Sequence, residues 1–235
     1  MFKYFLCLCI SFMCATAHAG FDHCKDQFAN GEPPTVQNSK LMNKNQEFCY
    51  NGFAVLYSGV SKTPIYSAQY YQPQDDQHAI RVNKFHGEAL LPTAERVVPG
   101  DYVGTGYDRG HATPYANMYT AQQRYDSFVM TNIFPQAPKN NQGVWRILEE
   151  KVRMDLNQAD QSAYIITGVI FNGQVIKSIH GILVPTHIYK VVYIPSTNTA
   201  QAYLSENRND AKVQQVALAD VEQLAQIHFF EHAVN

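Results

Sequence analysis

The densest group of reactive side chains in this chain of 235 residues is Asp108-Arg109-Gly110-His111. An imidazole with an ordinary pKa of ~6.5 can accept a proton from water at neutral pH. The guanidinium of Arg109 carries a fork of donors that suits phosphate oxygens. We expect Gly110 to allow a tight backbone bend that aims His111 away from the core. The alternative is structural, an Asp108–Arg109 surface ion pair beside a core histidine. The clustering favours chemistry on a phosphoester.

A helix is predicted over residues 142–155, directly after a second polar group. Val144, Leu148 and Val152 follow one another at intervals of four residues, which is typical of one apolar helix face. Asn141 stands where a residue that caps the amino end of the helix is expected.

This helix would carry candidates for a metal site. Helix geometry puts Glu149 about 12 Å along the axis from Asn141 and ~80° around it, with Arg153 one turn further on. Magnesium keeps most of its waters in proteins, so Asn141 could bind it directly while Glu149 holds a water on the ion. The alternative is that Asn141 is only a cap and Glu149–Arg153 only a salt bridge between neighbouring turns.

Together the two groups resemble the DNA/RNA non-specific endonucleases, the family that includes mitochondrial endonuclease G. The resemblance rests on Asp108-Arg109-Gly110-His111 and on Asn141-Gln142-Gly143-x-Trp145-x-x-Leu148-Glu149, and it extends from about Glu47 to His232. It includes residues 131–136, 184–192, 221–222 and 229–230. It implies an α+β fold in which a mixed or antiparallel sheet carries a ββα-metal active site. The implied activity is Mg²⁺-dependent cleavage of DNA and RNA to 5′-phosphate ends, with Mn²⁺ as a substitute ion.

The resemblance also implies roles for individual residues. His111 corresponds to the general base, Asn141 to the direct metal ligand and Glu149 to the acid that binds a metal water. Arg109 and Arg153 match arginines that contact the phosphate, Asn132 matches a site-organising asparagine and Asp108 an aspartate that orients the loop. The family has a further basic residue upstream, for which Arg81 and Lys84 are both candidates.

The elements that must hold these residues are predicted as strands and loops around the helix. Residues 20–46 read as an irregular arm and residues 47–235 as a single endonuclease domain without repeats or linkers. Apolar, β-branched runs predict strands at 47–58, 64–71, 162–171, 182–194 (split by Pro185) and 200–204, and a helix at 218–227. Residues 72–106 are expected to be loop.

The first nineteen residues have the features of a secretory signal peptide. Lys3 precedes an apolar run that ends in Ala17-His18-Ala19, so we expect cleavage after Ala19 and a secreted or periplasmic protein with no stable membrane association. The run is too short for a membrane anchor, which needs ~20 apolar residues. Only Cys24 and Cys49 follow it, and an exported chain favours one disulfide between them, worth ~3 kcal/mol, over two free thiols.

The overall charge argues neither for nor against a particular reaction. The formal charge of −2 becomes about −3 without Lys3, so a nucleic-acid partner would need a local basic surface. His228 and His232 have the spacing of an H-x-x-E-H zinc motif, which we interpret as a frayed helix end. Two other functions stay open: nucleic-acid binding without turnover, and hydrolysis of small or lipid phosphoesters by a secreted metal-dependent phosphodiesterase.

Overall fold

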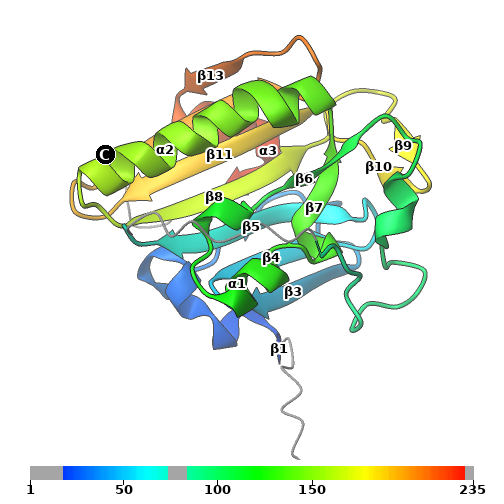
Figure 1. Cartoon of the computed structure of the whole chain (residues 1–235), viewed down its shortest axis with the longest axis horizontal. Coiled ribbons are helices and arrows are strands. Elements are labelled where there is room, and N and C mark those ends of the chain that lie inside the picture. Colours follow the sequence, from blue (N-terminus) through cyan, green and yellow to red (C-terminus); the bar gives the residue numbers. More distant parts are fainter. Residues whose placement is uncertain (1–17, 74–83, 231–235) are drawn as a thin grey trace, which may run out of the picture.

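A computed structural model describes residues 18–73 and 84–230, and its centre is one antiparallel sheet of eight strands (Figure 1). Each strand pairs antiparallel with its neighbours, which confirms the α+β prediction. In spatial order the strands are β1 (His18–Ala19), β3 (Asn45–Tyr50), β4 (Phe53–Ser58), β5 (Thr63–Tyr71), β8 (Ala163–Ile170), β11 (His187–Ile194), β12 (Thr199–Glu206) and β13 (Val213–Val216).

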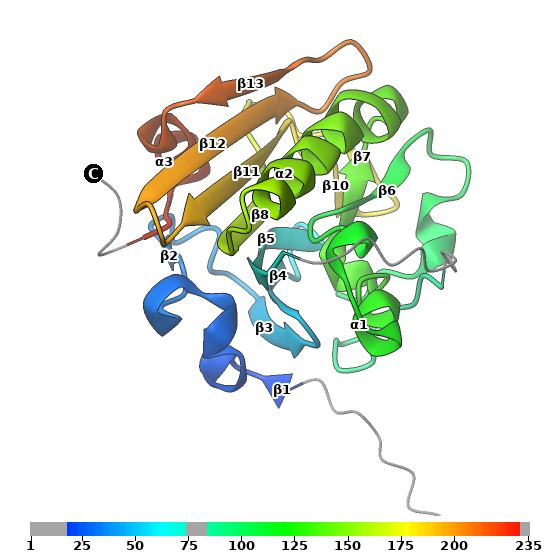
Figure 2. The same cartoon turned by 60° about the vertical axis from the view of Figure 1, so that its left-hand side comes forward.

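The central strands are buried on both faces because helices and loops cover each side. In β11, Ile188 and Val192 pack toward one cluster of apolar side chains, whereas Tyr189 and Val191 pack toward another. Successive side chains of a strand point to opposite faces, so this alternation divides the core into two layers. The long helix α2 (Arg146–Gln158) crosses the first face, and α3 (Leu218–Ala225) lies on the other (Figures 1 and 2).

The remaining elements are short. Helix α1 (Ala121–Asp126) begins at Thr120, whose hydroxyl accepts from the backbone N–H of Gln123 in a capping box. Two-stranded pairs form between β9 (Ser178–Ile179) and β10 (Ile182–Leu183), and between β2 (Thr35–Val36) and β14 (Ile227–His228). Single 3₁₀ turns occupy Phe21–His23, Lys25–Gln27, Ala29–Gly31, Pro99–Tyr102, Tyr115–Asn117 and Met130–Asn132.

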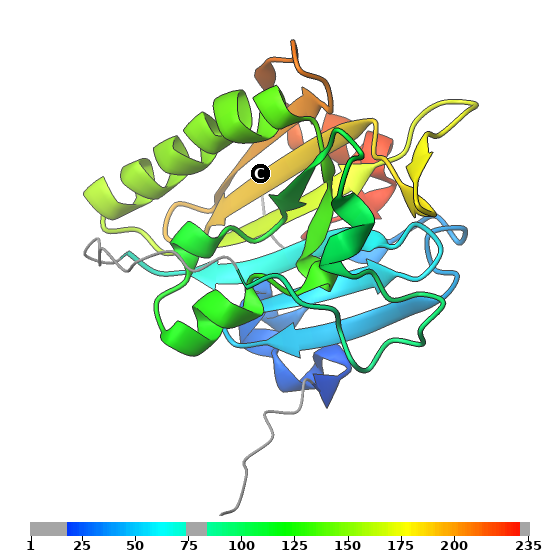
Figure 3. The same cartoon turned by 45° about the vertical axis from the view of Figure 1, so that its right-hand side comes forward.

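A separate pair of strands lies on the same side of the main sheet as α2 (Figure 3). Strand β6 (Asp108–His111) pairs with β7 (Ile133–Gln136), and His111 lies opposite Ile133. After β7 the chain passes through a π-helical turn (Asn140–Trp145) directly into α2. This order of two antiparallel strands and a helix is the ββα arrangement that the resemblance implies.

The N-terminal arm is fixed to the sheet by packing and by a covalent bond. Phe21 and Phe28 are buried in the apolar cluster on the α3 side. A disulfide joins Cys24 in this arm to Cys49 in β3, which confirms the predicted pairing. Because β2 also pairs with β14, the arm holds both the first strands of the sheet and the last described strand of the chain.

Two predicted strands are each divided in the structure. Residues 47–58 form β3 and β4, because Asn51-Gly52 makes a tight turn in which Gly52 has a φ of +85°. Asn-Gly is a strong hairpin signal, so this division was readable from the sequence. Residues 182–194 are split at Pro185 as predicted, with β10 before it and β11 after it in a different sheet. Strand β13 and helix α1 were not predicted.

The structure also corrects two predicted helix ends. The helical segment begins before residue 142, and the side chain of Asn141 caps nothing, because it lies inside the π-helical turn. The frayed helix end at His228 is wrong, since His228 lies in β14 with its Nδ1 3.0 Å from Oε1 of Glu222. The last histidine of that motif, His232, lies outside the described residues.

In the described part of the chain, no helix combines the length and apolar character that a bilayer crossing requires. Residues 1–17, on which the signal-peptide prediction mainly rests, are outside the described residues.

Candidate active site

A cleft of about 390 Å³ opens between β6 and the start of α2, and most of the predicted site residues line it. The side chains that meet there come from β6, from the loop after it, from the π-helical turn and from the first two turns of α2. They include Arg109, His111, Asn141, Glu149 and Arg153, together with Tyr115, Gln142, Arg146 and Glu150. Residues more than forty positions apart in the chain therefore share one surface.

His111 is held at the end of β6 by aromatic neighbours. Its ring lies 5.5 Å from that of Phe85 and 5.2 Å from that of Phe128, which it meets edge to face. The guanidinium of Arg109 lies 4.8 Å from the centre of the same Phe85 ring. Phe85 thus supports both the imidazole and the arginine while each still lines the cleft.

Asp108 orients the amide of Asn141. Oδ2 of Asp108 accepts hydrogen bonds from Nδ2 of Asn141 at 2.9 Å and from Nε2 of Gln142 at 2.7 Å. A carboxylate accepts but does not donate, so the NH₂ group of Asn141 must face Asp108. The carbonyl oxygen Oδ1 of Asn141 is thereby left for a cation.

Glu149 lies at the bottom of the cleft beside a buried lysine. Its side chain is 14% exposed, and its Oε1 is 3.8 Å from Nζ of Lys190, which is 2% exposed. Burial raises the pKa of Glu149, and the charges of Lys190 and Arg153 oppose this rise. Burial also lowers the pKa of Lys190 to about 8, against the raising influence of Glu149.

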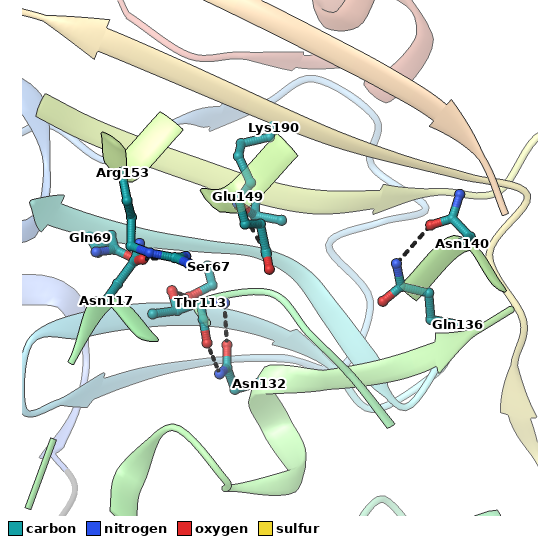
Figure 4. Close-up of polar contacts among 11 residues, drawn as sticks. Ser67, Gln69, Thr113, Asn117, Asn132, Gln136, Asn140, Glu149, Arg153 and Lys190 are labelled. Atoms are coloured by element: carbon teal, nitrogen blue, oxygen red, sulfur yellow. Dashed lines mark hydrogen bonds and ion pairs between the residues drawn. The ribbon is translucent and has the colours of Figure 1, made fainter. Parts of the chain in front are cut away.

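A buried amide side chain, itself held by a second one, orients Arg153 from the sheet side (Figure 4). Its Nη1 donates to Oδ1 of Asn117 at 3.3 Å, and Nδ2 of Asn117 donates to Oε1 of Gln69 in β5 at 3.0 Å. Asn117 and Gln69 are both buried. The guanidinium is therefore oriented by a chain of hydrogen bonds that begins in the main sheet.

Asn132 does not line the cleft but is fully buried beneath it (Figure 4). Its side chain donates to the carbonyls of Thr113 and Ser127 at 2.8 and 2.9 Å, and it accepts from the N–H of Thr113 at 2.9 Å. Its own carbonyl accepts from the N–H of Ala112. Asn132 thus fixes the backbone that follows His111, which makes it a positioning residue.

The upstream basic residue that contacts phosphate stays a prediction. Arg81 lies outside the described residues, and Lys84 has an exposed side chain that is not among those lining the cleft. The alternatives in which Asp108 and Glu149 form only salt bridges are wrong. Among the described residues, the ion pairs include neither Asp108–Arg109 nor Glu149–Arg153, since Asp108 bonds to amides and Glu149 pairs with Lys190.

The predicted bend at Gly110 is wrong. Gly110 lies inside β6, opposite Phe134, and it is not among the residues with a positive φ. Close packing requires glycine here, because a Cβ at this position would lie 2.7 Å from the Cβ of Gln136. Nε2 of Gln136 in turn donates to Oδ1 of Asn140, which ties β7 to the π-helical turn.

The oxygen atoms in the cleft that could bind a metal fit a hard divalent cation. Oδ1 of Asn141 and the carboxylate of Glu149 are oxygen ligands of the kind that Mg²⁺ prefers. Oε1 of Glu149 is buried, and no described residue donates a hydrogen bond to it. No cluster of three or more His, Cys, Asp or Glu side chains suited to a metal occurs in residues 18–73 and 84–230. The oxygens of the cleft therefore suit an ion that keeps most of its own waters.

The supporting residues Phe85, Asn117, Gln69 and Lys190 escaped the sequence prediction. For Lys190 a signal existed, because it is the only charged residue in an otherwise apolar strand, Ile188-Tyr189-Lys190-Val191-Val192. The other three carry no local pattern that distinguishes them from ordinary loop or strand residues.

Comparison with known proteins identifies the same family. The family model for DNA/RNA non-specific endonucleases matches residues 32–235. A nuclease of Nostoc sp. is 32% identical over 167 residues, which are 70% of this chain and 60% of that protein. Human mitochondrial endonuclease G is 36% identical over 123 residues, which are 47% of this chain and 41% of that protein.

A solved structure of the EndoG/EndoGI complex shows the same fold. Its TM-score is 0.71 at 23% identity, and the match covers 80% of this chain and 86% of the other. The chain spans about half the length of the curated relatives named above. The match over residues 32–235 includes the whole cleft, so this chain belongs to the DNA/RNA non-specific endonuclease family.

Proposed function

We propose that this protein is an exported, Mg²⁺-dependent endonuclease that hydrolyses DNA and RNA without sequence preference and leaves 5′-phosphate ends. Members of its family are typically metal-dependent. The observation that carries the proposal is the convergence of an imidazole, an oriented amide oxygen, a carboxylate and two guanidinium groups on one cleft. Those groups are His111, Asn141, Glu149, Arg109 and Arg153.

Each residue has a distinct task in this reaction. His111 takes a proton from the water that attacks phosphorus, so the new P–O bond forms as the bond to the 3′ oxygen breaks. Arg109 and Arg153 bind the non-bridging oxygens, on which negative charge develops. Asn141 would hold Mg²⁺ directly and Glu149 would hold it through water. When bound there, the ion neutralises charge on the leaving oxygen.

The lack of sequence preference follows from chemistry that is directed at phosphate, because phosphate contacts carry no base information. The overall charge of −2 means that binding must come from the arginines of the cleft. Cleavage should therefore weaken as the salt concentration rises.

Export is supported by two independent features. The first nineteen residues resemble a signal peptide, and a disulfide joins Cys24 to Cys49, as is usual in oxidising compartments. The sequence of the protein recovered outside the cytoplasm should begin at Gly20. An intact Met1 in that fraction would contradict cleavage, and absence of the protein from that fraction would contradict export.

A plasmid-nicking assay with and without EDTA tests the activity. His111→Ala should lose at least ~100-fold in rate, whereas His23→Ala, at an exposed position on the arm, should cleave normally. Asn141→Ala should need far more Mg²⁺. Near-normal cleavage by the His111 variant would refute its role as the base.

The same assay separates the two other functions. DNA binding without any nicking would indicate a binding protein of this fold. Turnover of bis-p-nitrophenyl phosphate without cleavage of plasmid or RNA would indicate a phosphodiesterase for small esters.

A further inference from the structure

We propose that Lys190 is a positioning residue that holds the carboxylate of Glu149 in place from inside the sheet, and this inference rests on the proposed function. Lys190 lies in the middle of β11, a strand that contributes no residue to the lining of the cleft. Its ammonium group nevertheless reaches the helix that lines the cleft.

The partners of Lys190 are few and specific. Its Nζ donates to Oγ1 of Thr167 at 2.5 Å, lies 3.8 Å from Oε1 of Glu149 and is 5.6 Å from the centre of the Trp145 ring. Lys190 and Thr167 face each other in the register of β11 and β8, so they point to the same side of the sheet. That side is the one that α2 covers.

Lys190 and Thr167 belong to a polar row that crosses this apolar face. In the paired strands, Ser67 of β5 stands next to Thr167, and Thr167 stands next to Lys190. The neighbouring positions on the same face are Ile165, Val169, Ile188 and Val192, all of them buried and apolar. The hydroxyl of Ser67 lies 2.6 Å from that of Thr113, which Asn132 holds below His111 (Figure 4).

A buried ammonium group at such a position is costly unless it is paired. Replacing a buried ion pair by apolar side chains is often neutral or stabilising, so the pair is poorly explained as a source of stability. The geometry of the Lys190–Glu149 pair is better explained by a role in orienting the carboxylate. Lys190 reaches Oε1 of Glu149 from the sheet, so it constrains the direction of a carboxylate that lines the cleft. Groups that orient a metal ligand in this way typically change metal affinity or activity ~10–100-fold when removed.

The test compares Lys190→Met with Lys151→Met, the same change at an exposed lysine of α2 that pairs only with Asp155. Binding of Mn²⁺ alone is measured by electron paramagnetic resonance, and thermal unfolding is recorded beside it. Removing a nearby positive charge would by itself tighten binding of a cation. We expect the opposite, an affinity at least ~10-fold weaker in Lys190→Met, with Lys151→Met unchanged.

A milder pair of variants covers the case in which Lys190→Met does not fold. Thr167→Val removes the acceptor that holds Lys190, whereas Thr167→Ser keeps a hydroxyl. Weaker Mn²⁺ binding by the valine variant alone supports the inference. Unchanged or tighter binding by both Lys190→Met and Thr167→Val would overturn it.

A double variant shows whether Lys190 acts through Glu149. Lys190→Met should add nothing to the loss caused by Glu149→Gln, in Mn²⁺ affinity or in cleavage rate, while additive losses would contradict the inference. If the wild-type protein neither binds Mn²⁺ nor cuts plasmid, the proposed function fails instead, and the two failures are therefore distinct.

Discussion

The amide of Asn141 and the carboxylate of Asp108 form one unit, with Nδ2 donating to Oδ2 at 2.9 Å across the gap between β6 and the π-helical turn. Neither residue needs to move for Oδ1 of Asn141 to meet a cation. Asp108 belongs to the motif that carries His111, so the position of the base and the orientation of the metal ligand depend on the same strand.

Asp108→Asn should therefore raise the Mg²⁺ concentration needed for half-maximal cleavage by ~10–100-fold. An amide at position 108 can accept or donate, so it no longer dictates which way the Asn141 amide faces. Cleavage rates over a Mg²⁺ titration measure this, with Asp155→Asn at the exposed far end of α2 as the control. An unshifted titration curve would show that Asn141 keeps its orientation without Asp108.

Asn117→Ala should raise the KM for DNA more than it lowers kcat. Arg153 loses the acceptor that aims its guanidinium, and we expect kcat/KM to fall ~10-fold, a transition-state loss of about 1.4 kcal/mol. Gln69 is left with an unpaired buried amide, which should destabilise the fold by about 1–3 kcal/mol. Gln158→Ala, at the exposed last position of α2, is the control, and an unchanged KM would mean that Arg153 does not need Asn117 to orient it.

Replacing both Cys24 and Cys49 by alanine should lower the free energy of unfolding by about 3 kcal/mol, because the crosslink closes a loop of 25 residues. Cys24 packs in the cluster on the α3 side of the sheet, away from the cleft. We therefore expect kcat/KM to stay unchanged well below the lowered melting temperature. Denaturant unfolding and cleavage rates of the same preparation test both parts, and a large loss of activity at full folding would contradict the second.

Stability should fall steeply above pH 10. Burial raises the pKa of several tyrosines well above the ordinary value of 10.0, namely Tyr50, Tyr57, Tyr66, Tyr102 and Tyr189. Above that value the unfolded chain releases protons that the folded chain keeps. Each such group thus contributes stability that is complete below pH 10 and is lost at about 1.4 kcal/mol per pH unit above it.

Unfolding in urea from pH 8 to 11.5, together with tyrosinate absorbance, measures this loss. Tyr66→Phe removes one of the raised groups, so the slope above pH 10 should become shallower by the share of one tyrosine. If the buried tyrosines ionise in the folded protein at pH 10, the explanation is wrong.

The site could be predicted where its residues are close in sequence. Asp108 to His111 form a strand, and Asn141, Glu149 and Arg153 follow one helical segment, so local spacing was enough to bring each group together. Fitting the two groups to one cleft required the family resemblance, because nothing local pairs β6 with β7.

The support beneath the site could not be predicted in the same way. Gln69 and Lys190 act across more than thirty residues of intervening chain, and the sequence around neither residue indicates its partner in the site. The prediction of a bend at Gly110 was wrong for a related reason. Its requirement comes from Gln136 on the neighbouring strand and not from its own backbone conformation.

The polar row on the α2 face has a consequence for protein engineering. The segment from Asp108 to Gln158 contains all the reactive groups and could be taken for a transferable unit. Strands outside it nevertheless support three of its parts. Lys190 holds Glu149, Gln69 supports Arg153 through Asn117, and Ser67 contacts Thr113 behind His111. Grafted onto another scaffold, the segment would keep its reactive groups and lose their alignment. A transplant should succeed only with a host sheet that supplies a lysine, an amide and a hydroxyl at matching positions.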